Sequence, residues 1–505
     1  MTVETTSATH SLWLEEPAPA PRLPALSGQA VDVAVIGGGI TGATTALLLA
    51  REGVSVALIE AARVGSGVTG ATTANVSALQ ATVLSTIRRR HGQEVATVYA
   101  QASLAAVGQV ALLAEQESLD CELNRAPAIT FALDESELSS VEQEADAAAA
   151  AGLGVEQVGD FDVPFSTPGA LRLSEQLAFH PVRYVRGLVD ALEREGALIR
   201  EEARVTGVSS RSPYTVHTSD GTVRAERVID ATHYPLLDRG MYFARLEPMR
   251  SYCIGVRLAG PGPLPRSMSI SAGSNSRSIR GHGRTLIIGG EGHTTGAGDA
   301  RPERFERLEA FAREHWDVQA VTHRWSAQDP VPYDHLPVIG PYLPRTDRLL
   351  VASGFMKWGL TGGTIAALVL RDRILGRANP WASTFDPNRI SPRGLPKLAQ
   401  LNTKVGLEMT GDRLKPAEAG DAQEIPPGEA RVVRDGLGKT GVYRDEAGGL
   451  HAVSLRCTHL GCLLRFNGAE RSWDCPCHGS RFAVEGEVLE GPASTPLERK
   501  EPPGA

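Results

Sequence analysis

The chain has 505 residues, 42% hydrophobic and 22% charged, which is typical of a soluble globular protein of about three domains. Its net charge of −8 argues against nucleic acid as a partner, because phosphate binding requires a basic face. No apolar run approaches the ~20 residues that a membrane helix needs. The segment Met1 to Glu16 lacks a secretory pattern, so the cytoplasm is the expected location.

The first predicted elements follow an irregular leader, residues 1–28, which is rich in proline, alanine and serine. Residues 31–36 and 54–59 are short apolar runs that predict strands, and residues 43–51 between them predict a helix. Strand, glycine-rich turn, helix and strand in this order open a doubly wound α/β domain.

Further elements are expected along the middle of the chain. Helices are predicted over 92–118, 135–152, 301–315 and 362–375, and strands over 198–208, 215–217, 223–229, 286–289 and 349–352. Residues 391–427 are proline-rich and predict a linker with one helix near 396–410. From residue 428 onwards, short strands and glycine turns predict a separate small β domain.

The turn after the first strand, Gly37-Gly38-Gly39-Ile40-Thr41-Gly42, contains the pattern G-x-G-x-x-G. Glu60 ends the next strand, close to the ~20-residue offset of an acidic residue that binds ribose hydroxyls. Gly37 would permit the tight turn, Gly39 the approach of a pyrophosphate to the helix N-terminus, and Gly42 close helix packing. The alternative is an ordinary turn that merely uses glycine.

Five stretches in family order resemble the FAD-dependent oxidoreductases of the D-amino-acid oxidase (DAO, glycine/sarcosine oxidase) family. They are residues 31–60, GVTGATTANVS (67–77), AFHPVRYVRGLVDAL (178–192), RVIDATHYP (227–235) and LPVIGPY…LLVASGFMKWGLTGGTIAAL (336–368). The resemblance implies a discontinuous α/β FAD domain of the DAO type (about 29–80, 160–235 and 325–390). An inserted mixed α+β substrate domain would occupy about 81–159 and 236–324.

The resemblance also implies which residues hold FAD. Thr72, Thr73 and Asn75 would lie near the flavin or its phosphates, and Val205, Ala231 and Thr232 near the adenine. The segment Trp358-Gly359-Leu360-Thr361-Gly362 would present helix N–H groups to the electron-rich end of the flavin. Singly, each threonine or asparagine is equally explained as a turn or cap residue.

Three residues are candidates for the substrate side of the flavin. Lys357, the first lysine in the chain, resembles a carboxylate-binding lysine of the sarcosine-oxidase branch, although the register differs by one residue. Tyr252 is a candidate for the substrate face, with a core or surface position as the alternative. His335 occupies a position near the flavin in family members, with a purely structural role as the alternative. No lysine precedes Lys357, so an oxygen-activating lysine in the substrate domain is not visible, and electrons are expected to leave by another route.

The C-terminal domain carries a metal-ligand pattern. Cys457-Thr458-His459 is followed after 15 residues by Cys475-Pro476-Cys477-His478. With CTHLGC, CPCHGS and Gly491-Pro492, these arms resemble the Rieske family, in which two thiolates and two neutral imidazoles hold a 2Fe–2S cluster. A structural Cys₂His₂ zinc site is the alternative, but it does not explain Cys462 and Cys477.

The Rieske resemblance extends to the surroundings of the cluster. In the cytochrome-bc branch the cysteines equivalent to Cys462 and Cys477 form a disulfide, so one is expected here. Ser480 matches a hydroxyl that bonds a bridging sulfide in high-potential members, but Phe482 stands where those members have a tyrosine donor. Fewer hydrogen bonds to sulfur predict a lower potential than that of the quinol-oxidising Rieske proteins.

Together these patterns predict a DAO-type flavoenzyme with a Rieske domain at 428–500, a combination that resembles a bacterial group of fused oxidoreductases. The expected reaction is oxidation of an amine or amino acid, with hydride passing to FAD and electrons leaving singly through the 2Fe–2S cluster to an external acceptor. In one alternative, an external reductase feeds the cluster and the flavin reduces a substrate or oxygen. In another, the chain is a redox sensor or electron-transfer protein without turnover.

Overall fold

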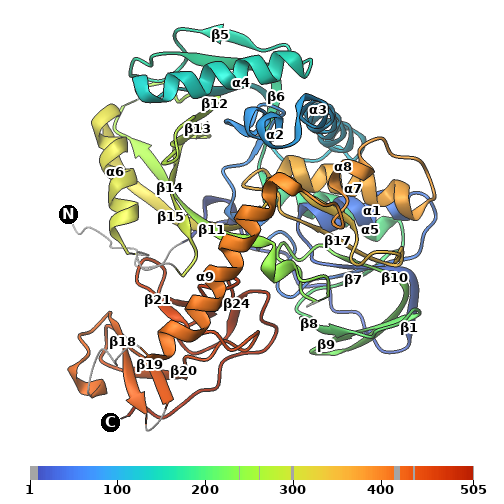
Figure 1. Cartoon of the computed structure of the whole chain (residues 1–505), viewed down its shortest axis with the longest axis vertical. Helices are drawn as coiled ribbons and strands as arrows, with labels where there is room; N and C mark the ends of the chain where they lie inside the picture. The colour runs from blue at the N-terminus through green and yellow to red at the C-terminus, as the bar shows by residue number, and fades with distance from the viewer. Residues whose placement is uncertain are drawn as a thin grey trace.

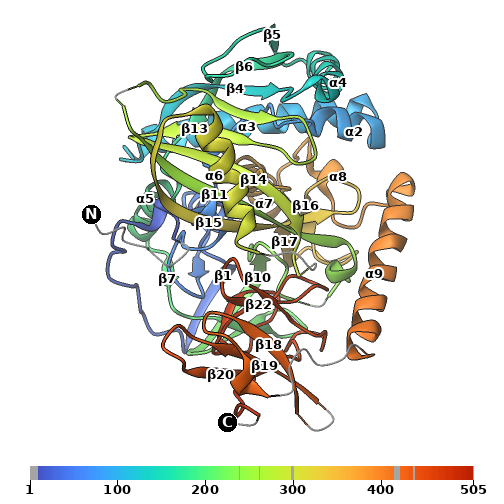
Figure 2. The same ribbon diagram turned by 90° about the vertical axis from the view of Figure 1, so that its left-hand side faces the viewer.

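The computed structural model describes residues 10–237, 239–260, 262–296, 301–414, 421–435 and 438–503. Two large sheets and their helices form one part, and a small β domain packs against it at the C-terminal end of the chain (Figure 1). The long helix α9, Leu395–Leu414, runs along the outside between them (Figure 2). A helix was expected near 396–410, within the linker.

The first sheet has eight strands, six of which follow the order β16-β17-β10-β1-β2-β7. β1 pairs in parallel with β2 and β10, and its buried apolar sequence is typical of a parallel strand covered on both faces. The strands are β1 (Gln29–Ile36), β2 (Val56–Ile59), β7 (Leu198–Arg200), β8 (Val205–Val208), β9 (Tyr214–Thr218), β10 (Gly221–Asp230), β16 (Val338–Pro341) and β17 (Leu349–Ser353). The single strand predicted over 198–208 is thus divided into β7 and β8.

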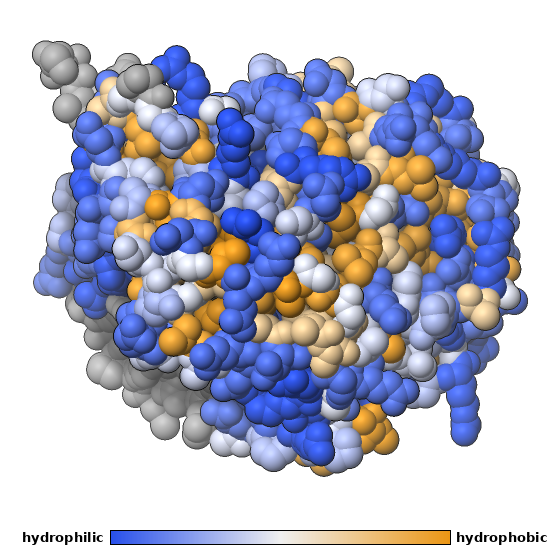
Figure 3. Space-filling view, turned by 90° about the horizontal axis from the view of Figure 1, so that it is seen from above, coloured by the Kyte–Doolittle hydropathy of each residue, from blue (hydrophilic) through white to orange (hydrophobic). Residues whose placement is uncertain are grey.

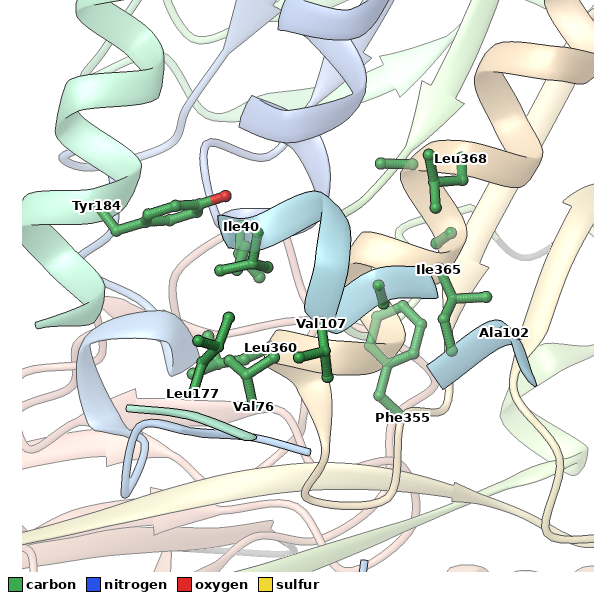
Figure 4. Close-up of a cluster of buried hydrophobic side chains, with 14 of the residues drawn as sticks. Ile40, Val76, Ala102, Val107, Leu177, Tyr184, Phe355, Leu360, Ile365 and Leu368 are labelled. Carbon is green, nitrogen blue, oxygen red and sulfur yellow. The ribbon is translucent and has the colours of Figure 1, made fainter. Parts of the chain in front are cut away.

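Successive side chains of β1 point to two different cores, as the period of a strand requires. Val33 and Val35 join the core formed with the helices, whereas Ala34 and Ile36 join the core formed with β8–β10. Figure 4 shows the helix-side core, in which Leu360, Ile365 and Leu368 of α7 lie near Val107 of α3 and Ile40 of α1. The helices are α1 (Ile40–Ala50), α2 (Val83–His91), α3 (Gln93–Gln116), α4 (Leu138–Ala150), α5 (Pro181–Arg194), α6 (Glu303–His315), α7 (Gly359–Ile374) and α8 (Ala382–Phe385).

The second sheet has nine strands, mostly antiparallel, in the order β15-β11-β14-β13-β12-β4-β6-β3, with β5 paired to β6. They are β3 (Asn75–Val76), β4 (Asn124–Phe131), β5 (Glu156–Val158), β6 (Ala170–Ala178), β11 (Leu246–Leu258), β12 (Met268–Ser271), β13 (Ser278–His282), β14 (Thr285–Thr294) and β15 (Val318–Pro332). β3 and β6 fall within the ranges predicted for the FAD domain, yet they hydrogen-bond into this second sheet. The chain therefore enters the second sheet between β2 and β3 and returns to the first between β6 and β7.

By length and composition, α3 is the one helix in the described residues that could cross a membrane, which the sequence pattern did not predict. In this structure its inner face packs against α2 and α7. Leu104 and Leu112 on its outer face are 42% and 45% exposed. Seen from above, apolar patches lie among hydrophilic residues on the surface of the molecule (Figure 3).

The C-terminal domain consists of a three-stranded and a four-stranded antiparallel sheet. The first contains β18 (Ala430–Asp435), β19 (Gly438–Arg444) and β20 (Leu450–Ser454). The second contains β21 (Arg465–Asn467), β22 (Ser472–Asp474), β23 (Arg481–Ala483) and β24 (Val488–Glu490). Leu455, Trp473 and Phe482 form its own buried core, which confirms the small all-β domain that was predicted.

Candidate functional site

The glycine-rich turn between β1 and α1 has the geometry that its sequence predicts. Gly37 has a φ of 106°, and a Cβ at this position would lie 2.5 Å from the carbonyl oxygen of Ala231. A Cβ on Gly42 would lie 1.9 Å from the Gly37 carbonyl, so the helix packs directly on the turn. Gly39 has no side chain to cap α1, and the N–H of Ile40 donates to Thr69 Oγ1 at 3.1 Å. The positive partial charge of the helix N-terminus still faces the cavity, where it favours an anion.

A cavity of about 700 Å³ extends from this turn, a volume in the range of cofactor sites. Glu60 lies at one end, where its two oxygens accept the N–H groups of Gly38 at 2.6 Å and Ala62 at 2.9 Å. Burial raises the pKa of Glu60, and these two backbone bonds oppose the shift. The remaining lone pairs of the carboxylate suit ribose hydroxyls.

Most of the residues predicted to hold FAD, from the glycine fingerprint and from the DAO resemblance, line this one cavity. They come from α1, β8, the loop after β10, the segment before β3 and the start of α7, namely Gly37, Gly39, Ile40, Thr41, Glu60, Thr72, Thr73, Asn75, Val205, Ala231, Thr232, Trp358, Gly359 and Leu360. Asn75 Oδ1 is buried without a hydrogen-bond partner in the described residues, as expected of a group that awaits a bound molecule. The residues present thus fit FAD.

Three predicted FAD residues lie behind the cavity wall instead. Gly42 supports the turn, as described above. Thr361 is fully buried and accepts the N–H of Ser77 at 3.1 Å. Gly362 lies against the ring of Phe355, where a Cβ would approach Cδ1 to 2.6 Å. All three shape the site without lining it.

The N-terminus of α7 borders the same cavity as Glu60. Trp358 precedes the helix, which has no side-chain cap, and Gly359 and Leu360 line the cavity. The first N–H groups of this helix are therefore available to an electron-rich ring edge.

Lys357 lies deep in the protein, yet its side chain is accessible to solvent because it borders the cavity. The turn before α7 gives Lys357 a φ of 74°. This conformation is unfavourable for a lysine and costs about 1 kcal/mol or more. Burial lowers the pKa of Lys357, while the nearby Asp329 and Cys253 oppose the shift. Asp329 also lines the cavity, and burial raises the pKa of its carboxyl.

The other two catalytic candidates lie elsewhere, which corrects the prediction for Tyr252 and His335. Neither residue lines the cavity. On β11, Ser251 and Cys253 face the cavity, so Tyr252 points to the opposite face, where its hydroxyl contacts His293 Nε2 at 3.1 Å. His335 has a φ of 62° in the turn after β15 and is surrounded by Arg90 and Asp334.

In the C-terminal domain, the four predicted cluster ligands lie on two loops that face each other. Cys457 and Cys475 are buried free thiols, and the rings of His459 and His478 are 5.1 Å apart. Both ring nitrogens of His478 are buried without a hydrogen-bond partner in the described residues. An imidazole in this state fits a metal ligand, since buried polar atoms are otherwise paired.

The predicted disulfide between Cys462 and Cys477 is present and joins these two loops. The sulfur atoms of Cys462, Cys475 and Cys477 also lie within 4.8 Å of one another, but two of them belong to this disulfide and are not ligands. Ser480 is buried, and its hydroxyl accepts the N–H of Ala493 at 3.0 Å. Phe482 is fully buried and offers no donor.

The small β domain also forms a wall of the FAD cavity, which no sequence pattern indicated. Its lining residues are Glu470, Arg481, Leu489, Glu490, Gly491, Pro492 and Ala493. Arg204 also lines the cavity, and its guanidinium donates to the carbonyl of Val488 at 3.1 Å. These lining residues could be predicted from the sequence only if the way in which the two domains dock were already known.

A buried ion cluster joins the two parts. Arg250 of β11 has no exposed surface and contacts Glu470 and Glu490 of the small domain, each at 3.0 Å. Arg481 contacts the same two carboxylates and Asp474. Both guanidinium groups are thus paired with acids, Arg250 across the junction and Arg481 within the small domain, as buried charges require.

The loop that carries His478 contacts the flavoprotein part closely. Gln328, which lines the cavity, donates its amide to the Gly479 carbonyl at 2.9 Å. A Cβ on Gly479 would lie 2.7 Å from Pro248 and from Gln328. A Cβ on Gly296 would lie 2.6 Å from Pro476. At Gly479 and at Gly296 the two parts of the molecule are therefore so close that there is no space for a methyl group between them.

The family model of the FAD dependent oxidoreductases, DAO, matches residues 32–373, and that of the Rieske [2Fe-2S] domain matches residues 415–501. The chain therefore belongs to the DAO family of FAD-dependent oxidoreductases and carries a C-terminal Rieske domain. Its cofactors are FAD and a 2Fe–2S cluster. The Rieske match begins upstream of residue 428, where the domain was predicted to start.

Among curated proteins, YhfW of Bacillus subtilis, named as a Rieske 2Fe-2S iron-sulfur protein, is 34% identical over 95% of both chains. Among solved structures, glycine oxidase from Geobacillus kaustophilus has a TM-score of 0.61 at 20% identity and covers 72% of this chain and 99% of its own. L-proline dehydrogenase from P. horikoshii has a TM-score of 0.59 at 18% identity and covers 73% and 98%. These two structures share the fold of the flavoprotein part.

Proposed function

We propose that this flavoenzyme oxidises the C–N bond of an amine or amino acid and that the electrons leave through its Rieske domain to an external one-electron acceptor. One observation carries the proposal: residues of the Rieske domain and the FAD fingerprint line the same cavity. FAD supplies a two-electron acceptor for C–N oxidation, and the 2Fe–2S cluster supplies a one-electron relay.

The substrate class is supported by the charge inside the cavity. Lys357 presents a cation near the start of α7, where it suits the carboxylate of an amino acid. A second buried cation, Arg250 of β11, is already paired with Glu470 and Glu490 and does not line the cavity. Glycine oxidase and L-proline dehydrogenase, which share the fold, are by name enzymes of amino acids.

The route of the electrons is supported by the junction. His478 lies one residue from Gly479, whose carbonyl accepts a hydrogen bond from Gln328 of the cavity wall. This contact is a short chain of bonded atoms from a cluster ligand to the flavin site. In the substrate domain no lysine faces the cavity, since the first lysine of the chain is Lys357.

The test is anaerobic addition of a panel of amines and D- and L-amino acids to the holoenzyme. Loss of the oxidised flavin absorbance, followed by the EPR signal of a reduced Rieske cluster, is the expected result. Bleaching that occurs only with an added reductase would instead support electron flow from the cluster to the flavin. A cluster that changes redox state with no substrate in the panel would support a sensor without turnover.

A further inference from the structure

The N-terminal segment, predicted to be an irregular leader, lies before the part of the chain that matches the DAO model. Residues 12–14 form a short 3₁₀ helix, and Trp13 has no exposed surface. Ser11 and Leu14 line the FAD cavity. Ion pairs fix the segment that follows, because Glu16 contacts Arg183 and Arg22 contacts Glu193.

Trp13 packs behind the cavity segment Ala71–Asn75. Its indole N–H donates to the carbonyl of Thr72 at 2.6 Å. The rings of His180 and His282 lie edge-on to it, with centroids 5.2 Å and 4.7 Å away, and the guanidinium of Arg280 lies 5.5 Å from its ring centroid. These contacts hold the indole ring on several sides and so fix the direction in which its N–H bond points.

Four consecutive carbonyls of this segment are bound by three buried side chains. Trp325 donates to Ala71 at 3.0 Å, and Trp13 donates to Thr72. Arg280 donates to Thr73 at 3.0 Å and to Ala74 at 2.6 Å. Neither Trp13 nor Arg280 lines the cavity, so the carbonyls of Thr72 to Ala74 that they bind point away from it.

The segment needs this support because its backbone is irregular. Ala74 has a φ of 63°, which is unfavourable for an alanine, and its carbonyl has no strand partner. Buried carbonyls without donors would also cost free energy. With the carbonyls directed backwards, Thr72, Thr73 and Asn75 remain on the cavity side.

We propose that the N-terminal segment is part of the FAD site, and that Trp13, with Trp325 and Arg280, is a positioning residue that holds residues 72–75 toward the cofactor. Trp13 acts through the Thr72 carbonyl and not by contact with FAD. The proposal concerns FAD binding, so it holds whichever substrate is oxidised and whichever way the electrons flow.

The test compares full-length Trp13→Phe with Trp381→Phe. Trp381 packs on the same hydrophobic core, but no indole hydrogen bond is found for it among the described residues. Phenylalanine keeps most of the apolar packing and removes the N–H, so the Thr72 carbonyl loses its donor. After FAD is removed, its dissociation constant is measured by flavin fluorescence, together with the visible circular dichroism of bound FAD.

Trp13→Phe is expected to raise the FAD dissociation constant about tenfold and to change the visible circular dichroism. The EPR signal of the Rieske cluster should match that of Trp381→Phe. An unchanged dissociation constant, or an equal rise in Trp381→Phe, would overturn the proposal. If Trp13→Phe lacks the Rieske signal, Arg280→Lys, which keeps the charge but not the two bonds, is judged by the same criteria.

Discussion

The two predicted histidine ligands of the Rieske domain lie in different surroundings. His478 is 1% exposed, and its ring lies 5.4 Å from that of Phe243 in the flavoprotein part. His459 is half-buried and borders a surface hollow with Arg456, Leu460 and Glu498. One side of the cluster site therefore faces the flavoprotein part and the other faces solvent, as the proposed relay between an internal and an external redox partner would require.

The largest effect is expected from removal of a cluster ligand, because without the cluster the two histidines no longer belong to a redox centre. Cys457→Ser should abolish the EPR signal of the dithionite-reduced protein, because serine does not replace a thiolate on iron. Flavin reduction by substrate should persist while electron output to a one-electron acceptor is lost. Cys121→Ser, at another buried free cysteine, should keep the signal. Zinc without an EPR signal in the unmodified protein would contradict the 2Fe–2S assignment.

Arg250→Met should loosen the side of the Rieske domain that carries His478. It leaves Glu470 and Glu490 with Arg481 as their remaining cation, and loss of one partner from a buried ion cluster costs about 3–5 kcal/mol. Chemical denaturation monitored by flavin and cluster absorbance should show this loss. Arg499→Met, which removes an exposed pair with Glu487, should change the stability by less than about 1 kcal/mol. Equal effects would mean that the junction does not depend on Arg250.

Acid should weaken the same junction. Burial alone would raise the pKa of Glu490, but Arg250 and Arg481 hold it below its usual value. A carboxyl with a lowered pKa adds stability above its unfolded pKa of about 4.3 and loses it as the pH falls through the folded value. The contribution of Glu490 should therefore be lost below about pH 4.3, and unfolding followed through that range should show a less steep loss of stability in Glu490→Gln.

The smallest expected effect concerns the cluster itself. Phe482→Tyr adds a phenol at the position where high-potential Rieske proteins have one, and a new hydrogen bond to sulfur should raise the reduction potential by roughly 40 mV. Redox titration of the cluster signal measures the change. Phe466→Tyr, on β21 of the same sheet, serves as the control and should leave the potential unchanged.

The glycine turn of the FAD site and the ligands of the cluster could be predicted because their residues are close together in sequence. Gly37 and Gly42 belong to one strand–turn–helix unit, and the cluster ligands fall on two short loops. The prediction for Tyr252 was wrong because neighbouring residues of a strand face opposite sides of the sheet. Cys253 therefore lines the cavity, whereas Tyr252, one position earlier, lies in the core. The positions of Trp13, Arg250 and Glu470 depend on contacts between segments more than 50 residues apart, for which one sequence carries no local pattern.

The close contacts of Gly479 with Pro248 and of Gly296 with Pro476 have a kinetic consequence. A Rieske domain on a free tether would have to diffuse between its donor and its acceptor, and added glycerol would slow each of its cycles. Here the domain is already docked, so the internal electron step is expected to be independent of solvent viscosity. Only the encounter with the external acceptor at the His459 side should then slow as viscosity rises.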